Sequence, residues 1–199
     1  LNALDCQRTL PLYLQASLLP KAERGELVAK AIDAFPQFVR FPNTLEEVAA
    51  LESIEECWFA RHLLACFYYN KRSYNKAIAL WQRCVEMSPE FADGWRGLAI
   101  HAWNKQHDYE LAARYLDNAY QLAPQDARLL FERDLLDKLS GVTPEKRLAR
   151  LENNLEIALK RDDMTAELLN LWHLTGQADK AADILATRKF HPWEGGEGK

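Results

Sequence analysis

The chain has 199 residues, enough to bury a sizeable core, and 48% of them are hydrophobic, as in ordinary soluble proteins. Its net charge is −4, and the acidic and basic residues are interspersed, so the sequence lacks the clustered Lys and Arg of a nucleic-acid-binding protein. No apolar run approaches ~18 residues, so we expect no membrane span. The four cysteines form no Cys-x-x-Cys pair, which favours buried core thiols over a metal or redox site. Cysteines without disulfides also fit a cytoplasmic location, which we therefore expect.

Residues 1–56 predict an irregular N-terminal helical cap. We expect helices over Gln7–Leu19, from Pro20 to about Phe35, and from Leu45 to about Glu56. Thr44, with Glu47 three residues later, forms the capping-box pattern that starts the third of these helices. Terminal units of a helical array are often atypical in this way.

Residues 57–188 carry a repeated pattern of small and large apolar side chains. It returns after about 34 residues, a period typical of stacked helix pairs. The predicted units are 58–91, 92–126, 127–161 and 162–188. The second has an extra residue in its turn, 105–108. The third is degenerate, with Arg133 and Asp134 at positions where Leu and Ala are expected, and a predicted helix from Thr143 to about Lys160.

These positions resemble the tetratricopeptide repeat (TPR) family. The resemblance is carried by Leu64, Ala65, Tyr68, Ala77, Trp81 and Pro89 in one unit, and by Trp95, Leu98, Ala99, Ala112 and Pro124 in the next. It implies an all-α fold in which antiparallel helix pairs stack as a right-handed solenoid.

A second resemblance is narrower. The chain is similar to a family of large bacterial proteins in a combination of four features: Phe38-Val-Arg-Phe-Pro42, the segment Leu45–Glu52, a Tyr/Trp-Asn-Lys turn, and the closing segment from Phe190 to Gly198. In that family a β-rich domain, resembling mutarotase-like sandwiches, precedes the helical repeats. Because the chain begins at Leu1 and ends in a Gly-rich stretch, 189–199, we expect it to be an internal fragment of a longer protein.

The TPR resemblance implies a concave groove lined by set positions of each unit. The candidate groove residues are Phe59, His62, Tyr69, Asn70, Arg96, Trp103, Asn104, Phe131 and His173. Tyr69 and Trp103 offer flat stacking surfaces, the two asparagines offer paired donors and acceptors, and Arg96 offers a forked contact to a carboxylate. The alternative is that the two aromatic rings pack on neighbouring segments of the chain while the asparagines cap the turns.

The C-terminal loop is a second candidate site. His191, Trp193 and Glu194 would face a ligand beside a neighbouring domain; the plainer interpretation is that Pro192 and Trp193 fix the loop to the last helix. The five histidines are spread over separate units without a His-x-x-x-His pair. We therefore predict no catalytic residues, no metal and no cofactor.

The predicted function is a non-catalytic interaction scaffold that binds a peptide segment, or a domain of the same polypeptide, in its groove. The alternative is a helper domain of a carbohydrate-active enzyme, which would contribute its aromatic groove and C-terminal loop to a sugar site. Neither prediction includes a nucleic-acid or membrane partner.

Overall fold

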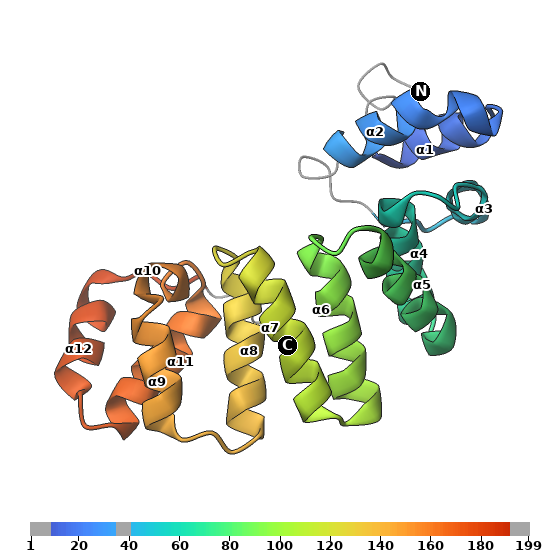
Figure 1. Ribbon diagram of the computed structural model, residues 1–199. Coiled ribbons are helices and arrows are strands. Elements are labelled where there is room, and N and C mark those ends of the chain that lie inside the picture. Colours follow the sequence, from blue (N-terminus) through green and yellow to red (C-terminus); the bar gives the residue numbers. More distant parts are fainter. Residues whose placement is uncertain (1–8, 35–40, 192–199) are drawn as a thin grey trace. The chain divides into compact units, whose positions relative to one another are not determined.

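The computed structural model describes residues 9–34 and 41–191, and these residues form helices, turns and loops without any strand. The predicted all-α fold is confirmed. The chain divides into two compact units, Leu1–His101 (unit 1) and Ala102–Lys199 (unit 2), coloured blue to green and green to red in Figure 1. The sequence did not predict a division between these residues.

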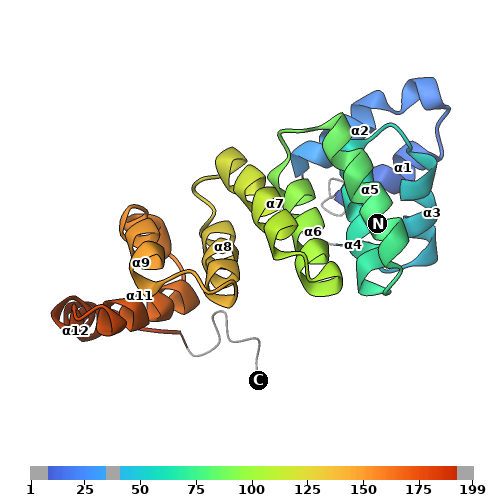
Figure 2. The ribbon, with the colours of Figure 1, turned by 60° about the horizontal axis from the view of Figure 1, so that its bottom comes forward.

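Unit 1 is a succession of helices in which each packs on its neighbours. The helices are α1 (Thr9–Ser17), a short 3₁₀ helix (Lys21–Glu23), α2 (Gly25–Ala34), α3 (Leu45–Ser53), α4 (Trp58–Asn70), α5 (Tyr74–Met87) and α6 (Ala92–His101). Helix α1 packs on α2 and α3, α3 on α4, α4 on α5, and α5 on α6 (Figure 2). One hydrophobic core runs beneath them from α1 to α4.

The predicted start of α3 is confirmed. The backbone N–H of Glu47 donates to Thr44 Oγ1 at 3.3 Å, and the N–H of Thr44 donates to Glu47 Oε2 at 3.2 Å. The two residues thus satisfy backbone donors that the first turn of a helix leaves without partners.

The prediction of one continuous helix from Pro20 to about Phe35 is wrong, because the described part of this segment, up to Ala34, forms a 3₁₀ helix followed by α2. The segment is divided at Arg24, whose Nε donates to Leu19 O at 2.9 Å and whose Nη1 donates to Ser53 O at 2.7 Å. These side-chain bonds satisfy carbonyl groups of the α1 and α3 ends, so Arg24 fastens three segments together.

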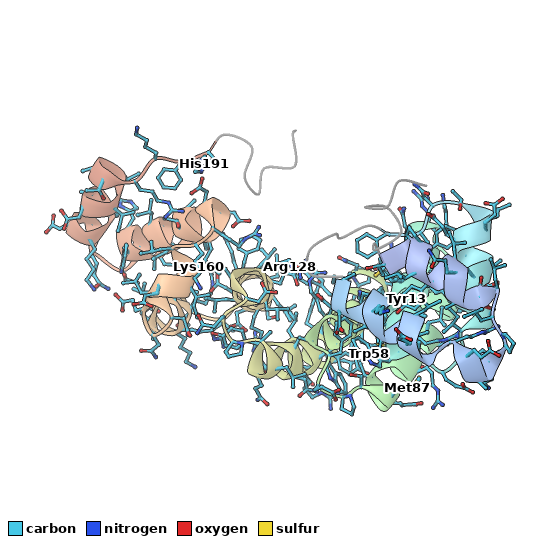
Figure 3. All side chains as sticks on the ribbon, turned by 90° about the horizontal axis from the view of Figure 1, so that it is seen from above. Tyr13, Trp58, Met87, Arg128, Lys160 and His191 are labelled. Atoms are coloured by element: carbon cyan, nitrogen blue, oxygen red, sulfur yellow. The ribbon has the colours of Figure 1, made fainter. Side chains whose placement is uncertain are left out.

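Helices α5 and α6 approach closely because Gly97 has no side chain. A Cβ atom built on Gly97 would lie 2.3 Å from Cε2 of Trp81, far inside any tolerated contact. The indole of Trp81, only 3% exposed, therefore packs flat against the backbone of α6. Tyr13, labelled in Figure 3, is likewise fully buried, and its hydroxyl lies 3.2 Å from Cys57 Sγ.

Unit 2 begins with a π-helical segment, Ala102–Gln106, and continues as α7 (Tyr109–Leu122), α8 (Ala127–Leu139), α9 (Pro144–Glu152), α10 (Leu155–Ala158), α11 (Asp162–Leu174) and α12 (Ala178–Thr187). Helix α7 packs on α8, α9 on α11, and α11 on α12. Leu130, Leu151, Met164 and Leu168 lie at the centre of its core.

The π-helical segment explains the extra residue in the predicted second repeat. A π turn spans one residue more than an α turn. The segment is followed by His107, which has a positive φ of 55°, and the Asp108 N–H donates to Ala102 O at 3.0 Å. The insertion is thus taken up by a wider helical turn.

The helix predicted from Thr143 to Lys160 is broken in the structure, so that prediction is wrong. Helix α9 ends at Glu152, and α10 starts after Asn154. Asn154 Nδ2 donates to Arg150 O at 2.9 Å, and the Tyr120 hydroxyl donates to Asn154 Oδ1 at 2.8 Å. Asparagine readily bonds nearby backbone in this way instead of continuing a helix.

Candidate functional site

The candidate surface of unit 1 is formed by two helices. Cys66 and Tyr69 lie three residues apart on α4, and Asp93 and Arg96 lie three residues apart on α6, so each pair shares one side of its helix. Burial raises the pKa of Cys66 to about 12; the Asp93 carboxylate adds to this rise and the Arg96 guanidinium opposes it. The two charged groups of α6 therefore lie near the thiol of α4. We call these four residues the α4–α6 face.

Phe59 and His62 lie beneath this face. Phe59 is 1% exposed and His62 is 5% exposed. The Phe91 ring packs edge-on against both, with centroids 6.0 Å from Phe59 and 4.9 Å from His62. The prediction that these two side chains line an accessible groove does not fit their burial, because the turn before α6 covers them.

Tyr69 belongs to an aromatic cluster. Its ring centroid lies 5.1 Å from Tyr74, 5.3 Å from Trp81 and 6.3 Å from His101. Tyr69 stays half-buried, and Asn70 beside it, the last residue of α4, is exposed. Of the two interpretations of Tyr69, packing against neighbouring segments describes its ring contacts.

The other predicted groove residues lie on unit 2. Trp103 is half-buried and Asn104 is exposed, both in the π-helical segment. Phe131 of α8 packs against the unit 2 core, and the Arg161 guanidinium lies 5.7 Å from its ring centroid. His173 is exposed near the end of α11. The role of these four side chains in lining a ligand-binding groove stays a prediction.

The C-terminal segment is fastened to the start of α11 through Asp162, which is 5% exposed. The backbone N–H of His191, labelled in Figure 3, donates to Asp162 Oδ2 at 2.5 Å. Arg188 Nη2 donates to Asp162 Oδ1 at 2.7 Å. His191 thus has a structural attachment. Trp193 and Glu194 lie outside the described residues.

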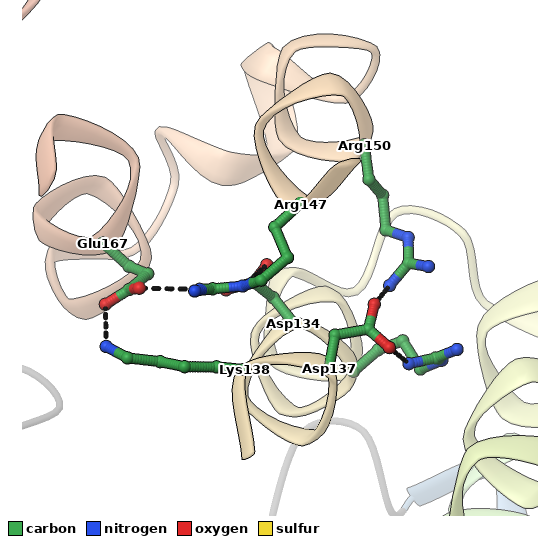
Figure 4. Close-up of polar contacts among 7 residues, drawn as sticks. Asp134, Asp137, Lys138, Arg147, Arg150 and Glu167 are labelled. Atoms are coloured by element: carbon green, nitrogen blue, oxygen red, sulfur yellow. Dashed lines mark hydrogen bonds and ion pairs between the residues drawn. The ribbon is translucent and has the colours of Figure 1, made fainter. Parts of the chain in front are cut away.

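A network of charged side chains in unit 2 was not predicted. Asp134 of α8 is 1% exposed, and Arg147 of α9 is 3% exposed. Arg147 Nε donates to Asp134 Oδ1 at 3.1 Å, and Nη2 donates to Asp134 Oδ2 at 2.5 Å and to Glu167 Oε1 of α11 at 2.6 Å (Figure 4). Lys138 Nζ contacts Glu167 Oε2 at 2.9 Å.

The network continues through Asp137, 5% exposed, which accepts from Arg133 and Arg150 (Figure 4). Each buried carboxylate therefore pairs with a guanidinium. Burial lowers the pKa of Arg147, but its hydrogen bonds to Asp134 and Glu167 raise it by more, so the pKa lies above its ordinary value. The sequence signal was the replacement of Leu and Ala by Arg133 and Asp134. In this chain a buried ion pair between Asp134 and Arg147 takes the place of an apolar contact at that position.

Within residues 9–34 and 41–191, no group of three or more His, Cys, Asp or Glu side chains is arranged to hold a metal ion. In the same part of the chain, no helix is both long and apolar enough to cross a membrane.

The helix pairs of the two units define an all-α, tetratricopeptide-repeat-like fold. Comparison with solved structures supports this class. The MamA protein matches with a TM-score of 0.57 at 15% identity, over 89% of this chain and 88% of that one. MamA from residue 41 onward, from Desulfovibrio magneticus RS-1, matches with a TM-score of 0.55 at 17% identity, over 89% of this chain and 92% of that one.

YrrB, described as a TPR protein with an unusual peptide-binding site, matches with a TM-score of 0.53 at 17% identity. The match covers 86% of this chain and 84% of YrrB. No family model matches the chain. At these identities the similarities establish the fold, and the predicted TPR-like architecture is confirmed.

Proposed function

We propose that the chain is a non-catalytic interaction scaffold, and that the α4–α6 face binds an extended peptide segment through an acidic group. The observation that carries this proposal is the position of Arg96, half-buried on α6 and close to Cys66 of α4. A guanidinium at a partly desolvated position recognises a carboxylate more strongly than one in open water, and its planar fork matches the carboxylate geometry.

Two neighbouring groups fit the remainder of a peptide. The exposed part of Tyr69 offers an apolar surface whose orientation is fixed by Tyr74, Trp81 and His101. The exposed amide of Asn70 can pair with a peptide backbone, since it carries both a donor and an acceptor. A rigid aromatic surface contributes contact area at a small cost in side-chain entropy.

The fold and the chemistry of the face support a binding role. YrrB shares this fold, and its description includes a peptide-binding site. On the face itself, burial and the nearby Asp93 raise the pKa of the Cys66 thiol to about 12. The thiol is therefore protonated at neutral pH and is a poor nucleophile. Among the contacts of the described residues, none favours the alternative of a carbohydrate-enzyme helper.

The proposal is tested by selecting a phage-displayed peptide library against the whole chain and measuring a selected acidic peptide by fluorescence anisotropy. Arg96→Ala should weaken binding about tenfold or more, as for a central interface arginine. Arg114→Ala, at an exposed position of α7, is the control and should leave the affinity unchanged. Selection of no acidic peptide, or equal affinities for Arg96→Ala and the wild-type chain, would refute the proposal.

A further inference from the structure

A polar cavity lies in unit 1, where the α3–α4 loop meets α5. It has a volume of about 430 Å³ and is lined by Glu55 and Glu56 of the loop, Arg61 of α4, and Ala79, Leu80 and Arg83 of α5. This volume is in the range that holds small ligands. We call it the Arg61 cavity.

The cavity is separate from the α4–α6 face. With 3.6 residues per turn, Arg61 projects roughly 110° around α4 from the side that carries Cys66 and Tyr69. Its α5 lining residues likewise avoid Trp81, which packs against α6. Occupation of the cavity therefore does not require the α4–α6 face.

Two hydrogen-bond donors of Arg61 lack acceptors. Its Nε and Nη2 atoms are buried and have no hydrogen-bond partner. Burial lowers the pKa of Arg61, and the attraction of the Glu55 carboxylate opposes this only in part. Buried guanidinium donors without acceptors are costly, so a rotation of the Arg61 side chain that turns them toward an acceptor would be favourable.

Glu55 provides the complementary charge across the cavity. Its carboxylate is exposed and close enough to influence Arg61, yet no ion pair or hydrogen bond joins the two side chains. Glu56, by contrast, is paired with Lys21, and Arg83 with Glu86. The lining of one cavity thus includes an arginine and a glutamate whose side chains do not bond each other, together with Ala79 and Leu80.

We propose that the Arg61 cavity binds a small zwitterion of the α-amino acid class. The ligand carboxylate would accept from the Arg61 guanidinium, after rotation of its terminal torsions, and the ligand ammonium group would donate to Glu55. Ala79 and Leu80 would contact a short apolar side chain. A free phosphate fits less well, because its larger negative charge would be repelled by Glu55 and Glu56.

The test is an NMR titration of the whole chain with L-alanine, with acetate and methylammonium as separate single-charge probes. L-Alanine should shift signals of Glu55, Arg61 and Leu80 and bind at least about tenfold more tightly than either single-charge probe. Arg61→Met and Glu55→Gln should each weaken L-alanine binding by about tenfold or more. Glu55→Gln changes an exposed side chain and keeps the test valid if Arg61→Met does not fold.

Arg114→Met, on an exposed position of unit 2, is the matched control and should bind as the wild-type chain does. Absence of saturable shifts at these residues would overturn the proposal. Equal binding of acetate and L-alanine, or unchanged binding by Glu55→Gln, would also overturn it. Because Arg96→Ala should leave L-alanine binding intact, failure here is distinct from failure of the peptide-binding proposal.

Discussion

Replacement of Arg147 by methionine tests the role of the unit 2 charge network. Arg147 is 3% exposed and makes three hydrogen bonds, two to Asp134 and one to Glu167. Methionine fills a similar volume but leaves the Asp134 carboxylate, 1% exposed, without its cation. Loss of one partner from a buried ion pair costs about 3–5 kcal/mol, a large share of the ~5–15 kcal/mol that stabilises a typical domain.

The pair as a whole should be dispensable even though neither partner alone is. Asp134 stands where the repeat pattern expects alanine, so Asp134→Ala combined with Arg147→Met converts the contact to apolar packing. Replacement of both partners of a buried ion pair is often neutral or stabilising, because the desolvation of both charges is avoided. We therefore expect the double variant to recover most of the stability lost by Arg147→Met.

The free energy of unfolding is measured by urea denaturation followed by far-UV circular dichroism, with hydrogen exchange on α8 and α9 peptides to assign the change to unit 2. Lys146→Met, an exposed position on the same helix, is the control and should stay within about 0.5 kcal/mol of wild type. The reasoning is refuted if Arg147→Met costs less than about 1 kcal/mol, the value of a surface pair, or if the double variant is as unstable as the single one.

Two further predictions follow from the packing and the charges. Gly97→Ala places a methyl group 2.3 Å from the Trp81 ring. It should separate α5 from α6 and lower the free energy of unfolding by about 1–3 kcal/mol, measured by thermal or urea unfolding. An unchanged unfolding midpoint would contradict this prediction. Burial raises the pKa of Glu167, but hydrogen bonds from Arg147 and Lys138 more than offset it and lower the pKa below its ordinary 4.5. A carboxyl whose pKa is lower in the folded state contributes stability above pH 4.5, and this stability is lost as the pH falls through the pKa of the folded state. Glu167→Gln should therefore flatten the acid limb of a curve of unfolding free energy against pH. An unchanged acid limb would count against this prediction.

Local chemistry in the sequence predicted much of the fold. The capping box of Thr44 and Glu47 set the start of α3. In the structure, Gly141 and Gly176, both with φ of 76°, follow the ends of α8 and α11, where a residue in the left-handed conformation commonly ends a helix. Helix pairs with small residues at close contacts were also predictable, because the repeat spacing places them on facing sides. Each of these features depends on residues close in the chain.

The features that escaped prediction depend on partners distant in sequence. Asn154 interrupts the expected helix where it accepts a hydrogen bond from Tyr120, 34 residues earlier in the chain. The buried Asp134 is explained by its ion pair with Arg147, which also bonds Glu167. For the candidate site, the family pattern already pointed to Arg96 and Tyr69, and their role in binding stays a prediction. The burial of Phe59 and His62 was not, because it follows from the position of the Phe91 ring.

The central claim, that Arg96 on the α4–α6 face binds a peptide carboxylate, is tested most directly by a double-mutant cycle. The affinities of wild type and Arg96→Ala are measured by anisotropy for the selected peptide and for the same peptide with its critical carboxylate converted to an amide. We predict a coupling energy of at least about 1 kcal/mol between the guanidinium and the carboxylate. A coupling near zero, with both changes weakening binding independently, would contradict the account.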